Sequence, residues 1–364
     1  MSKEFLSVFS FKEVFKQLWQ DKFARLALIL LSILYLSVAF AEFLAPYSKD
    51  FSDRTQAYVP PSKIFTIDEK GKFSKPYTYN YVRTFDEETF EITYKLDRSK
   101  KYYVNFLNKG VEYKFFGVIP TDRHLFGVEK DGRLFLLGTD INGRDNFSRL
   151  LFGGRISLTI GFLALFISFP LGMLYGGISG FWGGKVDSIM MRIAEAIMSI
   201  PSFYLLIILA AVLPSNMTSI QRFALIISIL AFIGWASFAR VIRGMVLSIK
   251  TQDFVVAARS YGASRLRIIT KHVLPQTLSY IIVAITLSVP SYILAESGLS
   301  FLGLGIQQPD ASWGNMLKEA QEYMNIVSRP WLLTPGFLIF VAVLSFNLIG
   351  DTIRDVLDPK SKVR

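Results

Sequence analysis

Very few residues of this 364-residue chain have types and spacings that could support catalysis or metal binding. The chain has no cysteine, which excludes disulfides, thiolate nucleophiles and Cys-ligated zinc or iron–sulfur centres. The topology argued below puts its two histidines, His124 and His272, on opposite sides of a membrane. They therefore predict neither a His-based metal cluster nor a Ser–His–Asp triad. We expect no catalytic residue and no metal site.

A phosphate-binding loop would reveal a chain that hydrolyses ATP itself. Such a loop reads Gly-x-x-x-x-Gly-Lys-Ser/Thr. The nearest approach is Gly183-Gly184-Lys185-Val186, which lacks the first glycine at its required spacing and has valine where the magnesium-binding hydroxyl belongs. We expect this chain to bind neither ATP nor another cofactor.

Two carboxylates fall within or at the ends of long apolar windows, Glu195 and Glu296. A carboxylate inside a membrane is costly and suggests an ion pathway or an ion pair. Arg192 lies three residues before Glu195, which is one helical step and makes it a ready partner. For both acids we favour a boundary or structural role over a proton relay.

The stretch 240–275 is too charged to cross lipid. Residues 253–258 and 264–274 have helical composition, Gly262 separates them, and Pro275 ends the pattern. These features predict two short helices and a hinge, lying flat against a membrane surface.

This segment allows two interpretations on physical grounds. Ala257 and Ala258 add little bulk and Gly262 tolerates close backbone approach, which suits insertion into a groove of another protein. A basic interfacial helix on anionic lipid headgroups is an equally good interpretation. The basic residues that would serve either one are Arg259, Arg265, Arg267 and Lys271.

The elements that would position these residues are membrane-spanning helices. The composition is 51% hydrophobic and 19% charged, and 156–182 contains no charged residue, which excludes a disordered chain and an ordinary cytosolic enzyme. A span needs about 20 mostly apolar residues. We predict an all-α polytopic membrane protein with six transmembrane helices, at 26–45, 156–181, 193–213, 223–239, 276–295 and 331–350.

The first window could instead be a signal peptide, because Ala39-Phe40-Ala41 resembles a cleavage site. The 25 residues before the window are long for the start of a signal peptide, so we favour a span. The net charge of +11 fits the enrichment of Lys and Arg on the cytosolic side of membrane proteins, and we expect no nucleic-acid partner.

The distribution of Lys and Arg predicts the orientation. The segments 1–25, 181–192, 240–275 and 351–364 hold 18 of these residues, and the short segments 214–222 and 297–331 hold 3. The positive-inside rule then puts both termini in the cytosol. The division is a cytosolic segment 1–25, a first span 26–45, an extracellular insertion 46–155, a five-helix core 156–350 and a cytosolic tail 351–364.

The insertion is too long for a plain loop and has a β-rich pattern. Phe90, Ile92, Tyr94 and Leu96 alternate with polar residues, and Asp131-Gly132 is expected to form a two-residue hairpin turn. The insertion could be a cap on the outer mouth or a docking surface for a soluble partner.

Gly172, Gly176 and Gly180 recur at four-residue spacing in the second window. They predict a bare helix face that a neighbouring backbone can approach closely.

The segment 253–275 resembles the "EAA" loop of binding-protein-dependent ABC importer permeases. The pattern of that loop is Glu-Ala-Ala, three residues, Gly and, further on, Leu-Pro. The matching residues are Ala257, Ala258, Gly262, Leu274 and Pro275, and Val256 stands where the pattern has Glu.

Other blocks resemble the C-subunit of the dipeptide/oligopeptide/nickel branch of these permeases. They are Leu137-Gly-Thr-Asp before the second window, Glu296-Ser-Gly-Leu at the exit of the fifth, and Gly350-Asp351 near the end. The resemblance covers 26–46 and 135–360, so the role of 47–134 stays open. The family-motif positions are Gly138, Thr139, Asp140, Gly143, Arg144, Asp145, Glu195, Glu296 and Asp351.

The resemblance implies a type I ABC importer permease fold in a bacterial or archaeal plasma (inner) membrane. It implies four kinds of partner: the lipid bilayer, a paralogous permease that completes a heterodimer, two ATPase subunits that bind ATP and Mg²⁺, and an extracellular solute-binding protein. In the family, the EAA segment is the coupling helix that docks in a cleft of the ATPase. The residues to which this assigns coupling are Ala257, Ala258, Arg259, Gly262, Arg265, Leu274 and Pro275.

The expected function is ATP-driven import of di- or oligopeptides by a subunit that is not itself an enzyme, with coupling through 253–275. The same machinery could import an oligosaccharide or nickel. A proton-coupled secondary transporter using Glu195 or Glu296 is a third alternative, against which no inverted repeat of broken helices is evident.

Overall fold

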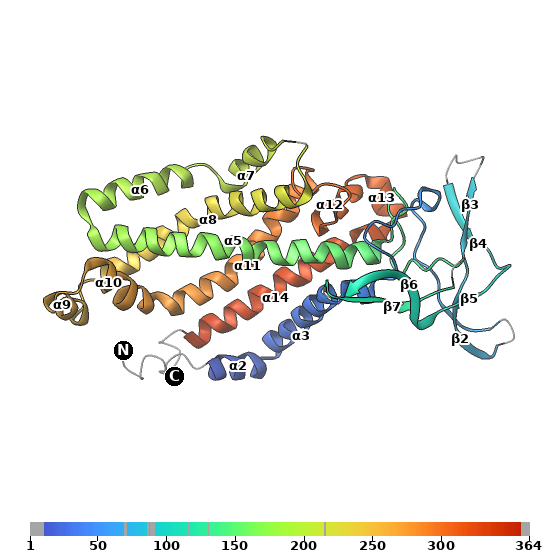
Figure 1. Ribbon diagram of the computed structural model, residues 1–364, viewed down its shortest axis with the longest axis horizontal. Helices are drawn as coiled ribbons and strands as arrows, with labels where there is room; N and C mark the ends of the chain where they lie inside the picture. The colour runs from blue at the N-terminus through green and yellow to red at the C-terminus, as the bar shows by residue number, and fades with distance from the viewer. Residues whose placement is uncertain are drawn as a thin grey trace. The chain divides into compact units, whose positions relative to one another are not determined.

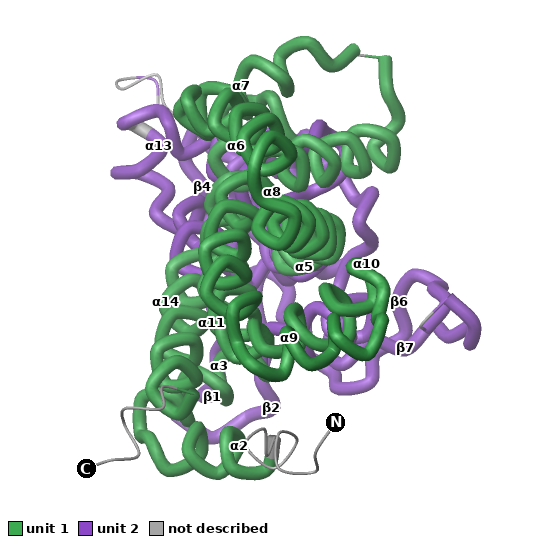
Figure 2. The backbone as a smooth tube through the Cα atoms, turned by 90° about the vertical axis from the view of Figure 1, so that its left-hand side faces the viewer, with its two compact units in different colours: residues 1–32, 158–305, 339–364 green, residues 33–157, 306–338 purple. Residues whose placement is uncertain are grey.

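The computed structural model describes residues 11–68, 71–85, 87, 92–115, 117–129, 131–214 and 216–357 (Figure 1). The chain divides into two compact units (Figure 2). Unit 1 comprises 1–32, 158–305 and 339–364, and unit 2 comprises 33–157 and 306–338.

Helices dominate the described chain, and five of them are long and apolar enough to cross a membrane. Three are single α-helices: α3 (Lys22–Ala39), α5 (Asn146–Trp182) and α8 (Ser219–Ile249). The other two candidate spans are the helical stretches Arg265–Phe301 and Pro330–Leu357, which contain α11 (Leu278–Phe301) and α14 (Thr334–Leu357). A short amphipathic helix, α2 (Phe11–Gln20), precedes α3.

A sixth span exists if one bent pair is counted as a single crossing. Helices α6 (Gly184–Met198) and α7 (Ser202–Ala211) meet at 76°, so the predicted continuous helix over 193–213 is wrong. Pro201 is the N-cap of α7. A proline has no N–H to donate and disfavours helical backbone in the residue before it, so the helix breaks there.

Proline acts differently at 275. The chain stays helical from α10 (Arg265–Ile268) through a π turn (Ile269–Val273) and a 3₁₀ turn (Leu274–Thr277) into α11. The prediction that Pro275 ends the helical pattern is therefore wrong. Pro275 stands in the first turn of the 3₁₀ segment, where its missing N–H would have had no helical partner in any case.

The glycine stripe of α5 packs against α8 within unit 1, as predicted. A Cβ added at Gly176 would lie 2.3 Å from the carbonyl oxygen of Ala239, and one at Gly180 would lie 2.8 Å from that of Arg243. The two backbones are thus closer than any side chain would permit. Beside this contact the rings of Phe169 and Phe238 pack with their centroids 4.0 Å apart.

Unit 2 contains three small antiparallel sheets. Their strands are β1 (Phe65–Ile67), β2 (Phe73–Thr78) and β5 (Tyr102–Tyr103) in the first, β3 (Tyr81–Phe85) and β4 (Ile92–Leu96) in the second, and β6 (Asn105–Phe115) and β7 (Ile119–Gly127) in the third. Strand β4 lies where alternation predicts it, whereas Phe90 and Glu91 fall outside the described residues.

The hairpin predicted at Asp131-Gly132 is wrong. The N–H of Gly132 donates to the carbonyl of Glu129 and closes a turn, but residues 133–137 form no strand. The residues that follow are used otherwise: the side chains of Leu134 and Phe135 are buried in unit 2. An apolar run after a turn signal thus marks core here rather than a second strand.

Short helices complete unit 2: α4 (Ala41–Leu44), α12 (Trp313–Leu317) and α13 (Tyr323–Ser328). Ser312 caps α12 by accepting from the N–H of Asn315, and the Asn315 amide oxygen accepts from the N–H of Ser312 in return. Trp313 is fully buried, and its indole N–H donates to the carbonyl of Leu150 (2.9 Å).

Candidate functional site

The predicted coupling segment, 253–275, is attached to unit 1 by a set of apolar side chains. Its first helix is α9 (Asp253–Ser260). A Cβ added at Gly177 of α5 would lie 3.2 Å from the side chains of both Ile269 and Leu274, so these two residues pack closely on that helix. The buried side chains of the segment are Val255, Ile268, Ile269, Val273 and Leu274.

Gly262 forms the hinge between α9 and α10. Its φ is +77°, a left-handed conformation that glycine adopts without strain, and its N–H donates to the carbonyl of Arg259. A Cβ added there would have nothing within 4 Å. Ser264 then caps α10 by accepting from the N–H of Arg267. The predicted pair of short helices around Gly262 is confirmed.

The outer face of the segment combines apolar and basic side chains. Tyr261 is 91% exposed and Val256, at the position of the motif Glu, is 54% exposed. Ala257, Arg259 and Arg265 are also exposed, and the Arg259 guanidinium lies 5.6 Å from the ring centroid of Phe181. An apolar face of this kind on a short helix, bordered by arginines, is typical of a protein-docking surface.

The acids singled out in the sequence have different environments. Glu195 of α6 is 4.0 Å from Arg192, and both side chains are more than half exposed, so the pair stabilises little. Glu296 of α11 is fully buried and accepts from the hydroxyl of Ser300 (2.6 Å). Asp351 of α14 is exposed.

The motif before α5 contains two glycines that the local packing requires. Gly138 and Gly143 have φ of +64° and +67°. A Cβ would lie 2.6 Å from the carbonyl oxygen of Val59 at Gly138, and 1.7 Å from that of Asp53 at Gly143. The buried hydroxyl of Thr139 accepts from the N–H of Val59 (2.8 Å). These residues fix the chain ahead of α5 against 53–59.

Asp140 is the centre of a buried ionic cluster in unit 2. One carboxylate oxygen accepts from the backbone N–H groups of Asn142 (2.8 Å) and Arg144 (3.0 Å). The other accepts from Nε of Arg144 (2.6 Å) and lies 3.6 Å from Nε of Arg149. All three charged side chains are at most 8% exposed, so each needs its partners to offset the loss of hydration.

Three members of this cluster, Arg149, Gln308 and Glu319, are not among the residues predicted from the sequence. The amide oxygen of Gln308 accepts from both Arg144 and Arg149, and Glu319 accepts from the N–H of Ile141 (3.0 Å). Neither Gln308 nor Glu319 carries a local signal, because the residues that they contact are more than 150 positions away in the chain.

Two carboxyl groups of this region have raised pKa values. Burial raises the pKa of Asp145 to about 7, although one of its oxygens accepts from the N–H (2.8 Å) and the hydroxyl (2.6 Å) of Ser148. Burial, followed by the negative charge of Asp140, raises the pKa of Glu319 to about 7. Among the described residues, no group of three or more His, Asp and Glu side chains could hold a metal ion.

Comparison with known proteins places these features in a family. The family described as "Binding-protein-dependent transport system inner membrane component" matches residues 168–363, and "N-terminal TM domain of oligopeptide transport permease C" matches residues 10–61. The chain belongs to the family of binding-protein-dependent inner-membrane permeases. It is thus a transport component and not an enzyme, and it is a multi-pass protein of the inner membrane.

Individual relatives are more than 40% identical to this permease over the aligned residues. It is 45% identical to the dipeptide transport system permease protein DppC of Bacillus subtilis (61% of this chain, 68% of the relative). It is 44% identical to the oligopeptide transport system permease protein OppC of Haemophilus influenzae (62% and 70%). It is 42% identical to the glutathione transport system permease protein GsiD of Escherichia coli (67% and 74%).

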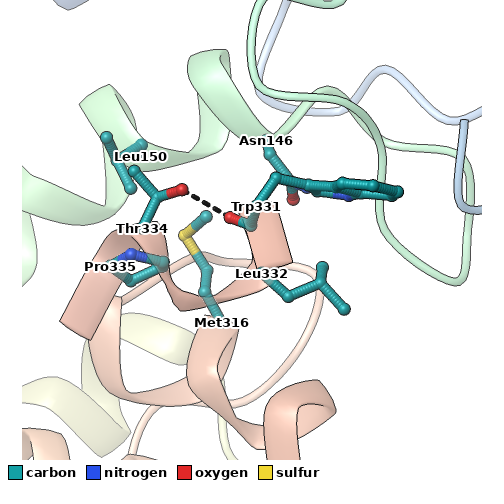
Figure 3. Close-up of a pocket in the computed structure, with 7 residues that line it drawn as sticks. All are labelled: Asn146, Leu150, Met316, Trp331, Leu332, Thr334 and Pro335. Carbon is teal, nitrogen blue, oxygen red and sulfur yellow. Dashed lines mark hydrogen bonds between the residues drawn. The ribbon is translucent and has the colours of Figure 1, made fainter. Parts of the chain in front are cut away.

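A small pocket in the described part of unit 2 lies between the start of α5, α12 and the start of α14 (Figure 3). Asn146, Met316 and Trp331 line it, and the hydroxyl of Thr334 donates to the carbonyl of Trp331 beside it. It has room for about one water molecule. It is therefore a packing gap and not a site for a peptide.

Proposed function

We propose that this permease is the C-subunit-like membrane component of an ATP-driven importer of di- and oligopeptides. It pairs with a related permease, and two ATPase subunits carry the ATP and Mg²⁺ while this chain binds no cofactor. An extracellular solute-binding protein delivers the peptide. The names of the relatives, which include dipeptide, oligopeptide and glutathione permeases, favour peptides over an oligosaccharide or nickel.

The proposed orientation puts both termini and the coupling segment in the cytosol. It rests on the excess of Lys and Arg in 1–25, 181–192, 240–275 and 351–364. Residues 46–155 then lie outside the cell as a β-containing insertion between the first span and the five-helix core at 156–350.

The observation that carries the proposal is the two-sided character of the coupling segment. One side is buried through Val255, Ile269 and Leu274, and the other exposes Val256, Tyr261 and the arginines. The buried side contacts α5 at Gly177, so a displacement of α9 and α10 would be passed to that helix. An exposed side that docks on an ATPase would therefore couple closure of the ATPase to tilting of the spans.

Gly262→Trp tests this coupling, and Gly184→Trp is its matched control. Both glycines have positive φ (+77° and +54°), and neither would have an atom within 4 Å of an added Cβ. Both substitutions thus add the same side chain and the same backbone strain, about 1–2 kcal/mol. Only Gly262 lies in the coupling segment.

We expect Gly262→Trp to insert into the membrane and to lose uptake of peptide in vesicles that contain the complete transporter, while ATP is still hydrolysed. Gly184→Trp should retain uptake. Peptide import and ATP hydrolysis would be measured on the same vesicles. Normal import by Gly262→Trp would show that this segment does not transmit motion.

A further inference from the structure

The hairpin of β6 and β7 ends in an apolar tip. The tip comprises the described residues 115 and 117–119, in which Gly117 turns the chain at a φ of +75° and Phe115 pairs with Ile119. Val118 is 78% exposed and Ile119 is 61% exposed. Lys114, also exposed, precedes the tip. An exposed apolar turn beside a lysine is an unusual surface for a loop in water.

The tip lies next to the end of the first span. The rings of Phe115 and Phe40 are 5.7 Å apart, and Phe40 directly follows α3. Helix α4 lies against both strands of the hairpin. Figure 1 shows the hairpin alongside the C-terminal end of α3.

The contacts also give the direction in which the hairpin points. Tyr113 and Phe115 share one face of β6; Tyr113 lies close enough to Glu42 to interact with its charge, and Phe115 contacts Phe40. The step from Glu42 to Phe40 leads toward the span, and the step from Tyr113 to Phe115 leads toward the tip. The tip therefore points toward the membrane and not away from it.

The depth that the tip reaches follows from standard dimensions. The turn beyond Phe115 extends it by one or two residues, or roughly 3–7 Å at strand spacing. Four helical residues, from Phe40 back to Leu36, cover about 6 Å. The tip thus reaches the level of Leu36, whose side chain is 57% exposed on α3, as is that of Ile33.

We propose that the hairpin tip inserts into the bilayer interface beside the first span. Val118 and Ile119 contact the outer ends of the acyl chains, continuing the exposed apolar surface that Ile33 and Leu36 present to lipid. Lys114 lies at the headgroups, where its charge pairs with lipid phosphates. The hairpin is thus a second attachment to the membrane, and it holds the insertion at a fixed height above it.

The absence of cysteine makes a site-specific test straightforward, because each single cysteine can be labelled alone. An environment-sensitive fluorophore is attached at Val118→Cys, with Ile119→Cys as a second tip position. Leu36→Cys provides the lipid reference. Phe73→Cys is the matched control, because Phe73 is an apolar residue of the same unit that is 90% exposed. It belongs to β2, which Figure 1 shows well away from the hairpin tip.

The labelled chains are placed, with their partner subunits, in nanodiscs of phosphatidylethanolamine and phosphatidylglycerol. Quenching by a lipid that carries a nitroxide near its headgroup is compared with quenching by aqueous iodide. We expect the labels at 118 and 119 to behave like the label at 36, with blue-shifted emission that the lipid quenches and iodide does not. The label at 73 should show the opposite.

Two results would overturn the proposal. If iodide quenches the label at 118 as strongly as that at 73, the tip lies in water. If neither quencher reaches it, a protein subunit covers the tip instead of lipid. Because the measurement requires no transport, it is independent of the proposed coupling.

Discussion

Gly176→Ala should destabilise the permease through the close contact between α5 and α8. The new Cβ would lie 2.3 Å from the carbonyl oxygen of Ala239 and 3.0 Å from the backbone nitrogen of Arg243. These are backbone atoms, so no side-chain rotation relieves the contact. The helices must separate by about 1 Å to restore an ordinary distance. Overpacking of this kind costs about 1–3 kcal/mol, which exceeds the gain of at most about 1 kcal/mol from alanine in a helix.

The matched control is Gly244→Ala in α8. Gly244 is also a helical glycine, but nothing lies within 4 Å of an added Cβ. We expect it to be neutral or to stabilise by up to about 1 kcal/mol. The free energy of unfolding would be measured by titrating the purified permease in mixed micelles with sodium dodecyl sulfate and following tryptophan fluorescence.

The result that would refute this reasoning is a Gly176→Ala variant as stable as Gly244→Ala. It would mean that α5 and α8 do not touch along the glycine stripe, or that they separate without cost. A loss confined to Gly176→Ala, with secondary structure retained, would locate the cost at the contact between the two backbones.

Two further perturbations test polar contacts. Asp187 accepts from Nε (2.7 Å) and from a terminal nitrogen (2.5 Å) of Arg243. Asp187→Asn should lower the free energy of unfolding by about 1 kcal/mol in the same titration, because Arg243 is one-third exposed and partly hydrated. An unchanged midpoint would argue against a stabilising ion pair. The pKa values of Asp145 and Glu319 are raised from about 4 to about 7. Between pH 4 and pH 7 the folded state therefore binds more protons than the unfolded state, and the free energy of unfolding decreases as the pH rises toward 7. Melting temperatures of the wild type should fall from pH 5 to pH 8, and Glu319→Gln should reduce this slope; equal slopes would contradict the assignment.

The features that sequence predicts well are those with a local physical cause. Long uncharged windows require helices in a membrane, and α3, α5, α8, α11 and α14 are all present. Four-residue spacing puts three glycines on one helix face, and a glycine between two short helical patterns marks a positive φ, as at Gly262. Neither inference needs knowledge of a distant residue.

The failures come from features that a window average or a short motif cannot weigh. The window 193–213 is apolar on average, and that average hides the break that Pro201 imposes. The Asp131-Gly132 dipeptide is a turn signal, but the apolar residues after it belong to the core rather than to a strand. Gln308 and Glu319 join the cluster around Asp140 only because the chain brings them there from a distance.

Burial separates two kinds of motif residue that look alike in the sequence. Thr139, Asp140 and Arg144 are at most 7% exposed, and their side chains form hydrogen bonds within unit 2. The structure therefore accounts for these residue types without any partner protein. Ala257 and Gly262 are exposed, although the φ of +77° at Gly262 is itself a reason for glycine there. The exposed side chains of α9 and α10 are therefore available to a partner protein, which the buried motif residues are not. This difference in exposure is the physical reason why we propose coupling at α9 and α10 and a structural role for the motif before α5.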